Sequence, residues 1–121
     1  MSANQGRIVR ADVSDPQGHN RKCRPVVLIS VTDDTPEARR YLAVALTTRF
    51  TQPPSNVEVP IPWNRDPTKV RTRLTKPCVA KCSWLVEIAE SDIQSYAGVV
   101  PPQELILILE KVSKLQSSPG D

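Results

Sequence analysis

Short apolar runs separated by polar turns divide this chain, and several of them have the pattern of β-strands. Val9–Val13 alternates apolar and polar residues with a period of two, which predicts a half-buried strand with Val9, Ala11 and Val13 facing the core. Val26–Ser30 begins with a continuous apolar run that is typical of a strand buried on both faces. Tyr41–Leu46 is a second such run, and Lys76–Ile88 is also strand-like.

The remaining pattern predicts one edge strand and one helix. Asn56–Trp63 alternates, but its two prolines cannot donate hydrogen bonds to a β-ladder, so it is predicted to be an edge strand or a pseudo-strand. Pro101-Pro102 opens an amphipathic helix that is predicted to end by Gln116. Five or so short strands followed by one helix predict a mainly β domain, a small bent sheet or barrel closed by the helix.

Composition narrows the class of protein. The 121 residues suffice for one domain with a modest core. No apolar stretch is long enough to cross a membrane and the N-terminus lacks the apolar region of a signal peptide, so we expect a soluble, cytoplasmic protein with no membrane partner. Three cysteines, Cys23, Cys78 and Cys82, are expected to stay thiols in a reducing compartment. Cys78 and Cys82 are four positions apart, but the single histidine, His19, is far from this pair in sequence, so the sequence predicts no metal site.

Charge is unevenly distributed along the chain. Residues 1–81 hold 14 Lys and Arg against 7 Asp and Glu, whereas residues 82–121 hold 2 against 6. The first two thirds therefore form a cationic body that can attract a polyanion. The plainer alternative is that scattered Lys and Arg side chains only keep the chain soluble.

Arg24 is the leading candidate for chemistry because it stands directly before the Val26–Ser30 strand. A polar loop of turn formers, which contains His19, leads into it. Thr47 and Thr48 end the Tyr41–Leu46 strand, and their hydroxyl groups could bind a phosphate or a ribose. Each feature also has an ordinary explanation, since Arg24 could be a solvated charge and threonine is a common strand residue.

The densest basic segment runs from residue 64 to residue 81 and has Trp63 at its head. It holds six cations, Arg65, Lys69, Arg71, Arg73, Lys76 and Lys81, and one acid, Asp66. An aromatic side chain beside Arg and Lys is what single-stranded nucleic acid requires for base stacking and backbone neutralisation. Alternatively, Trp63 packs on the core and the charges belong to a solvated loop.

Several segments together resemble the MazF/PemK family of toxin endoribonucleases. GRIVRADVSDPQGHNRKCRPVVLIS resembles the opening of that family, in which a first strand is followed by a D-P-x-x-G-[SH]-E loop and an R-P strand. LAVALTT resembles the next strand of the family, and GVVPPQELILILEKV resembles its closing helix. The resemblance covers residues 6–115, which we expect to be one domain between disordered ends at 1–5 and 116–121.

The resemblance implies both a fold and an activity. The fold would be the SH3-like barrel of the MazF/PemK/CcdB toxin type, and the protein would be a homodimer held in check by a small antitoxin. Single-stranded RNA would be cut without metal or cofactor, by attack of a ribose 2′-OH on the adjacent phosphate. Arg24, Thr47 and His19 would be catalytic, and RNA would be bound by Arg21, Lys22, Thr48, Trp63, Arg65, Arg71, Arg73, Lys81 and Ser83.

The chain departs from the family pattern where the family carries acids. Asn20 replaces the acid of the loop motif, and Lys81 and Ser83 stand where some members have an Arg/Asp-type pair. His19 could take over proton transfer near neutral pH. Two alternatives stay open: a catalytically weak barrel that only binds RNA, and a toxin of the same barrel that poisons a protein such as gyrase.

Overall fold

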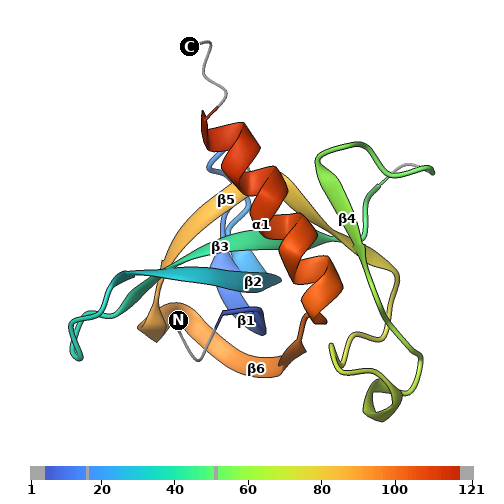
Figure 1. Cartoon of the computed structure of the whole chain (residues 1–121). Helices are drawn as coiled ribbons and strands as arrows, with labels where there is room; N and C mark the ends of the chain where they lie inside the picture. Colours follow the sequence, from blue (N-terminus) through green and yellow to red (C-terminus); the bar gives the residue numbers. More distant parts are fainter. Residues whose placement is uncertain (1–4, 16, 51, 118–121) are drawn as a thin grey trace.

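The computed structural model describes residues 5–15, 17–50 and 52–117. In that part of the chain, six strands are followed by one α-helix, which confirms the mainly β fold with a C-terminal helix (Figure 1). The elements in chain order are β1 (Arg7–Val13), β2 (Lys22–Asp33), β3 (Arg40–Thr47), β4 (Glu58–Ile61), the 3-10 helix η1 (Pro67–Lys69), β5 (Cys78–Ala89), the 3-10 helix η2 (Glu90–Asp92), β6 (Ile93–Val99) and α1 (Pro102–Ser117).

All six strands form one curved antiparallel sheet in the order β4-β5-β3-β2-β1-β6. β4, which contains Pro60, lies at one edge and pairs only with β5, so the predicted edge strand is confirmed. The register of β2 and β3 pairs Val26 with Ala45 and Val27 with Val44. The start of β2 therefore lies beside the end of β3.

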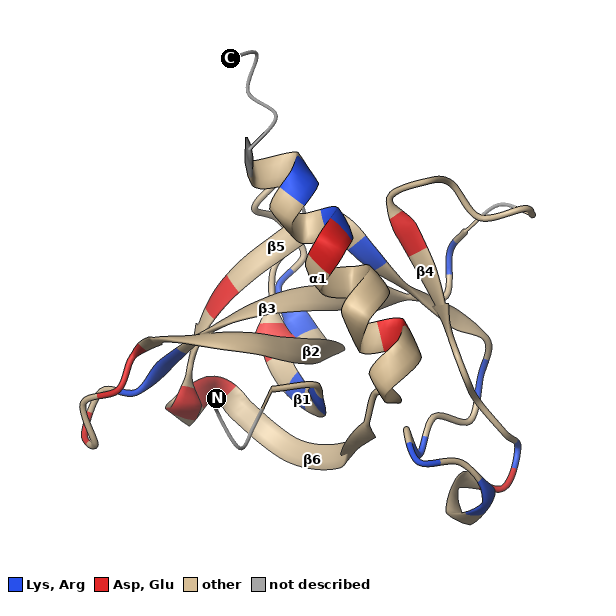
Figure 2. Ribbon diagram, in the orientation of Figure 1, with Lys and Arg blue, Asp and Glu red and all other residues tan. Residues whose placement is uncertain are grey.

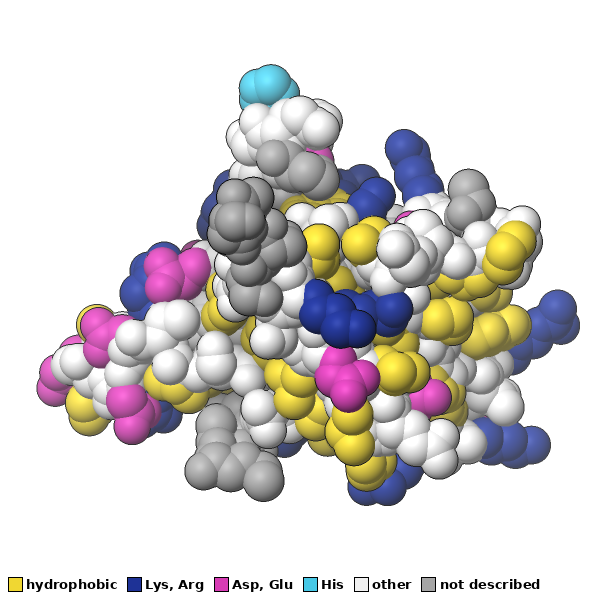
Figure 3. Space-filling model, turned by 45° about the horizontal axis from the view of Figure 1, so that its top comes forward, with side chains coloured by type: hydrophobic (Ala, Val, Ile, Leu, Met, Phe, Trp, Pro, Cys, Tyr) yellow, Lys and Arg dark blue, Asp and Glu magenta, His cyan; other side chains and the backbone are white. Residues whose placement is uncertain are grey.

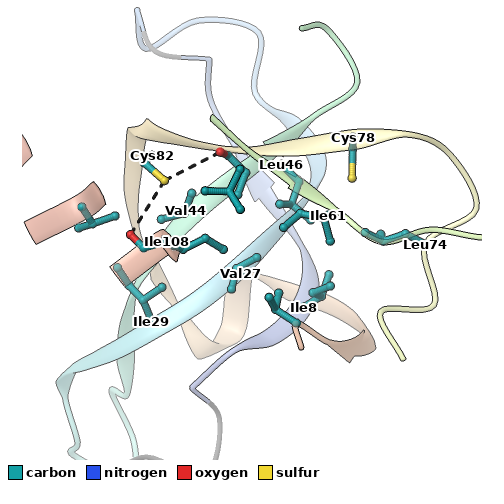
Figure 4. Close-up of a cluster of buried hydrophobic side chains, with 14 residues drawn as sticks. Ile8, Val27, Ile29, Val44, Leu46, Ile61, Leu74, Cys78, Cys82 and Ile108 are labelled. Carbon is teal, nitrogen blue, oxygen red and sulfur yellow. Dashed lines mark hydrogen bonds between the residues drawn. The ribbon is translucent and has the colours of Figure 1, made fainter. Parts of the chain in front are cut away.

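Both faces of the central strands are buried, as predicted for Val26–Ile29. Val27 and Ile29 face α1, where they join Val44 and Ile108 in a cluster that also contains the Cys82 thiol (Figure 4). Their neighbours Val26 and Leu28 join a second cluster on the opposite face, together with the side chains of Val9, Ala45 and Trp84. The alternation of side chains along a strand explains this division.

β6 was not predicted from the sequence. Its segment IQSYAGV contains no strong alternation, and its residues are mostly half-buried or exposed. Pairing with β1 holds this strand in place. Its last residues also bind the main chain of a distant loop, because the Gly98 and Val99 amides donate hydrogen bonds to the carbonyls of Thr72 and Arg71. Long-range contacts of this kind leave no periodic signal in the local sequence.

Both ends of the described chain take part in the fold. Gln5 donates a hydrogen bond from its side-chain amide to the Ile29 carbonyl, and α1 continues through Ser117. The rest of the ends that were expected to be disordered, 1–4 and 118–121, lies outside the described residues. Among the described helices, none has both the length and the apolar character needed to cross a membrane.

Candidate functional site

A groove opens where the start of β2, the end of β3 and the start of β5 come together. Its volume is about 830 Å³, and the loop between β1 and β2 supplies part of its lining. Asp15 is the one acid among the described residues that line it. Because five cationic side chains oppose this one carboxylate, the groove favours an anionic ligand. These cations are Arg21, Lys22, Arg24, Arg49 and Lys81.

Arg24 is held in a fixed position at this groove. Its Nε donates to the Val13 carbonyl at 3.0 Å, and one Nη donates to the Asn20 carbonyl at 2.8 Å. The guanidinium lies 5.2 Å from the centre of the Trp84 ring, a cation-π contact with a side chain that is only 8% exposed. Within the described part of the chain no carboxylate pairs with Arg24, so its charge and its other Nη remain available to a ligand.

The loop that precedes Arg24 is organised by Asp15. One carboxylate oxygen accepts hydrogen bonds from the amides of Gln17 and His19, at 3.0 and 2.8 Å, and the other accepts from the Asn20 side chain at 2.9 Å. The hydrogen bond from the His19 amide, together with that from Asn20, lowers the pKa of Asp15 below its usual value. The ionised carboxylate therefore shapes the loop whose Asn20 carbonyl orients Arg24.

Threonine and lysine side chains complete the lining next to Arg24. Thr47 ends β3, and its hydroxyl oxygen accepts a hydrogen bond from the Arg49 amide at 3.0 Å, which leaves the hydroxyl hydrogen to donate elsewhere. Thr48 and the half-buried Lys81 line the same groove. Arg24, Thr47, Thr48 and Lys81 come from three different strands or strand ends, and the sheet brings them together.

Other predicted site residues lie outside this groove. His19 is exposed on the loop, one residue from Asn20, but its side chain is not among those that line the groove (Figure 3, cyan). Ser83 is exposed on β5. Four more are exposed between β4 and β5: Trp63, Arg65, Arg71 and Arg73. No three His, Cys, Asp or Glu side chains gather as a metal-binding group in the described segments.

The sequence model of the PemK-like, MazF-like toxins of type II toxin-antitoxin systems matches residues 4–115. The match covers nearly the whole chain. This chain belongs to the MazF/PemK toxin family.

Solved structures confirm the fold of this MazF/PemK family member. An endoribonuclease in complex with its cognate antitoxin, from a mycobacterial species, superposes with a TM-score of 0.67 at 20% identity, over 98% of both chains. The Mycobacterium tuberculosis toxin MazF-mt6 superposes with a TM-score of 0.63 at 21% identity, over 89% of this chain and 93% of that one. Among curated proteins, no sequence is significantly similar to this chain.

The departure from the family loop motif has a structural counterpart in this chain. Asn20 stands where the motif carries an acid, and it has a positive φ of 54°, a conformation that asparagine tolerates well. Its side chain donates to Asp15 while its carbonyl accepts from Arg24. A carboxylate at this position would face the Asp15 carboxylate instead of donating to it. Asn20 therefore links the loop to Arg24.

Sequence reasoning missed several groove residues, among them Arg49, Trp84 and the cysteines. Trp84 belongs to an apolar strand segment, and that pattern does not distinguish a core indole from one that stacks on Arg24. Cys78 also lines the groove, where burial raises the pKa of its thiol to about 11, whereas Cys23 is exposed beside Arg24. Only the paired strands reveal that these cysteines share one groove.

Proposed function

We propose that this protein is an endoribonuclease toxin of a type II toxin-antitoxin system that cuts single-stranded RNA in the cytoplasm without a metal ion. The observation that supports this proposal best is the Arg24 guanidinium, which is fixed by two carbonyls and Trp84 in a cationic groove and has no carboxylate partner among the described residues. A fixed guanidinium suits a phosphate whose negative charge increases during the reaction.

The proposed reaction uses the RNA as its own nucleophile. The ribose 2′-oxygen forms a bond to the adjacent phosphorus, the bond from phosphorus to the 5′-oxygen breaks, and a cyclic 2′,3′-phosphate and a 5′-hydroxyl result. The proton of the 2′-OH passes to a base, and the departing 5′-oxygen receives a proton. The pentacoordinate intermediate carries additional negative charge, which Arg24 stabilises with its unused Nη group.

Thr47 and His19 have supporting roles in this proposal. The Thr47 hydroxyl, whose oxygen already accepts from the Arg49 amide, donates its hydrogen to a phosphate oxygen. His19 transfers a proton once RNA is bound, since hydrogen bonds of catalytic groups often form only in the substrate complex. Arg21, Lys22, Thr48 and Lys81 bind the phosphates of the strand in the groove, and Ser83, on the exposed surface of β5, contacts the RNA beyond it.

The experiment incubates purified protein with RNA of mixed sequence in EDTA and maps the new 5′-hydroxyl ends. Cleavage is expected to persist in EDTA and to fall about 10²–10³-fold in Arg24→Ala, the loss seen when one donor to a developing oxyanion is removed. Arg10→Ala is a matched control, because Arg10 is an exposed cation on the neighbouring strand β1. Circular dichroism checks that each variant is folded.

Two results would contradict the mechanism. Cleavage that requires a divalent metal ion would show that the groove does not act through Arg24 alone. Cleavage that is undiminished in Arg24→Ala would remove the proposed role of the guanidinium. If the folded parent does not cut RNA but binds it, the second candidate applies: a barrel that binds RNA without cutting it, which the replacement of the family acid by Asn20 favours.

A homodimer and an antitoxin belong to the same proposal. The outer side of α1 exposes Ile106 and Leu107 to 58% and 45%, an apolar surface that a second copy would cover. Sedimentation analysis tests the dimer. The antitoxin binds as an extended acidic segment that competes with RNA for the groove, so saturating antitoxin should release labelled RNA; simultaneous binding of both would contradict this idea.

A further inference from the structure

The basic segment between β4 and β5 forms a surface that the groove does not include. We call residues 63–76 the basic arch. All its lysines and arginines are exposed, and in the described part of the chain none of their side chains has a hydrogen-bond or ion-pair partner: Arg65, Lys69, Arg71, Arg73 and Lys76. Its one acid, Asp66, accepts from the Thr68 amide and hydroxyl at 3.0 and 2.7 Å. Five cations therefore face solvent with no counter-charge beyond a carboxylate that caps η1.

The main chain of the arch is firmly held although it contains little regular structure. The Thr72 side chain is completely buried; its hydroxyl donates to the Pro62 carbonyl at 2.7 Å and accepts from the Leu74 amide at 3.2 Å. The Asn64 amide donates to the Leu74 carbonyl at 2.9 Å, which closes the base of the arch. A main chain that is already ordered does not have to become ordered when a ligand binds, which lowers the entropic cost of binding.

Arg73 shows how this scaffold directs charge outward. Its φ is 59°, an uncommon conformation for a residue other than glycine, asparagine or aspartate. Its neighbours Thr72 and Leu74 are both buried, whereas Arg73 is exposed. The unusual backbone conformation thus accommodates two inward side chains and leaves the guanidinium in solvent.

An aromatic side chain stands at the head of the arch. Trp63 is 40% exposed and immediately precedes the charged residues. Figure 2 shows the basic positions on both sides of η1 with a single acidic one among them. On the face in Figure 3, cationic side chains project from the right-hand part, whereas several acidic side chains lie in the left-hand part with cationic ones beside them. An indole beside guanidinium groups can stack on a base while the cations neutralise phosphates.

We propose that the basic arch is a second RNA-binding surface, which holds single-stranded RNA outside the groove. This inference deepens the proposed function, on which its role in the reaction rests. The exposed indole distinguishes RNA from an acidic peptide as the ligand, because bases offer a planar face for stacking. The arch contains no residue of the groove, so it raises affinity for longer strands and lowers KM without changing kcat.

The experiment measures binding to fluorescent single-stranded RNA in which every ribose carries a 2′-O-methyl group. Such RNA has no 2′-OH to attack, so binding is measured whether or not the protein cuts RNA. The test variant is Arg71→Ala with Arg73→Asn, since asparagine tolerates the positive φ of residue 73. The control variant, Arg39→Ala with Arg40→Ala, removes the same charge from cations that pair with Asp34, Glu90 and Glu87 on other elements.

Removal of the two arch arginines should weaken binding of long strands and lower the slope of log affinity against log salt by about 0.7 per lost contact. Trp63→Ala should weaken binding by about five-fold or more with a smaller change in slope. For short oligonucleotides that fill only the groove, both variants should bind like the parent. In cleavage assays of long RNA, KM should rise and kcat should stay unchanged.

Equal affinities and equal salt slopes for the arch variants, the parent and the Arg39/Arg40 control would overturn the inference. If the arch variants lose antitoxin binding but keep RNA binding, the inference is wrong and the ligand of the arch is a protein. If the parent binds long 2′-O-methyl RNA through the arch but cuts no RNA, the arch stands and the proposed endoribonuclease activity fails. Thermal unfolding of each variant confirms that the loss is not a loss of folding.

Discussion

The Arg24 guanidinium lies over the Trp84 ring at 5.2 Å, and the two residues come from strands β2 and β5, which are not adjacent in the sheet. Trp84 also packs into the cluster on that face of the sheet. The guanidinium of Arg24 therefore packs on the indole, which helps to fix its position. A positioning residue should affect the reaction through Arg24 while making no bond to the RNA itself.

Two replacements of Trp84 should therefore show whether the reaction depends on the aromatic face of this side chain or only on its bulk. Trp84→Phe keeps an aromatic face and loses a buried indole N–H that has no hydrogen-bond partner in the described part of the chain, so kcat should fall less than about three-fold. Trp84→Leu removes the cation-π contact and should lower kcat by about ten-fold or more. Single-turnover cleavage measures the effect. A double variant with Arg24→Ala should show no further loss; additive losses would mean that Trp84 acts independently of Arg24.

Asp15→Asn should loosen the loop that presents Arg24. The replacement amide cannot accept from the Asn20 side chain through its nitrogen, so one of the three hydrogen bonds is lost and two donors face each other. Cleavage should fall by about ten-fold or more, since small displacements of a catalytic group are costly. Amide exchange at Gln17 and His19 should become faster.

The pH dependence of this loop follows from the lowered pKa of Asp15. Because the folded protein favours the carboxylate, the contribution of this group to loop stability is complete above the ordinary value of 3.8 and is lost as pH falls below it. Loop order should thus be constant between about pH 5 and 8. Asp33→Asn is the matched control: it removes the charge of a carboxylate that likewise accepts from a nearby amide, that of Thr35, at the β2–β3 hairpin. A loss of cleavage in that control would assign the effect to general destabilisation.

The position of Arg24 could be predicted because the evidence is local. A cation and a proline directly before an apolar run place a guanidinium at the mouth of a strand, and Thr47 likewise follows from the end of a strand. That Arg24 and Thr47 line the same groove could not be predicted from the local sequence. It depends on the register that pairs Val26 with Ala45, which is set by packing on both faces of the sheet.

In the basic segment, residues that are close in sequence belong to two different surfaces, which sequence reasoning did not predict. Lys81 and Arg71 are ten positions apart in one charged stretch, yet Lys81 lies on β5 in the groove and Arg71 lies on the arch. Buried Thr72 and Leu74 decide this division, and their inward positions depend on contacts with β6 and with residues near Pro62. Charge density in a sequence indicates a polyanion ligand but does not say how many surfaces share the charges.

Cys23 should be the one thiol of the folded protein that reacts rapidly with a disulfide reagent at pH 8. Burial raises the pKa of Cys78 and of Cys82 to about 11, so their thiolate fractions at pH 8 are about 10⁻³. Cys23 is exposed and lines the groove, so an anionic adduct on it should weaken RNA binding. Titration with an anionic aromatic disulfide should modify one thiol per folded chain and three per unfolded chain. Cys23→Ser should bind RNA normally before and after treatment; rapid modification of that variant would contradict the burial of the other two thiols.

Gly98→Ala should displace the basic arch from β6. A Cβ at residue 98 would clash with the Arg71 carbonyl oxygen and lie 2.6 Å from the Thr72 carbonyl carbon, and main-chain atoms cannot rotate away as a side chain can. The hydrogen bonds from Gly98 to Thr72 and from Val99 to Arg71 would then be strained. Overpacking of this kind typically costs about 1–3 kcal/mol, so the melting temperature should fall by several degrees.

Gly18→Ala is the control for the effect of backbone strain without a steric clash. Gly18 has a φ of 84° and no atom within 4 Å of an added Cβ, so alanine there should cost about 1 kcal/mol and leave the arch in place. Salt-dependent binding of long 2′-O-methyl RNA, measured beside thermal unfolding, distinguishes the two variants, because only Gly98→Ala should lower the salt slope. If Gly98→Ala melts and binds RNA like the parent, the close approach of β6 does not hold the arch, and the order of its cations must come from Thr72 and Leu74 alone.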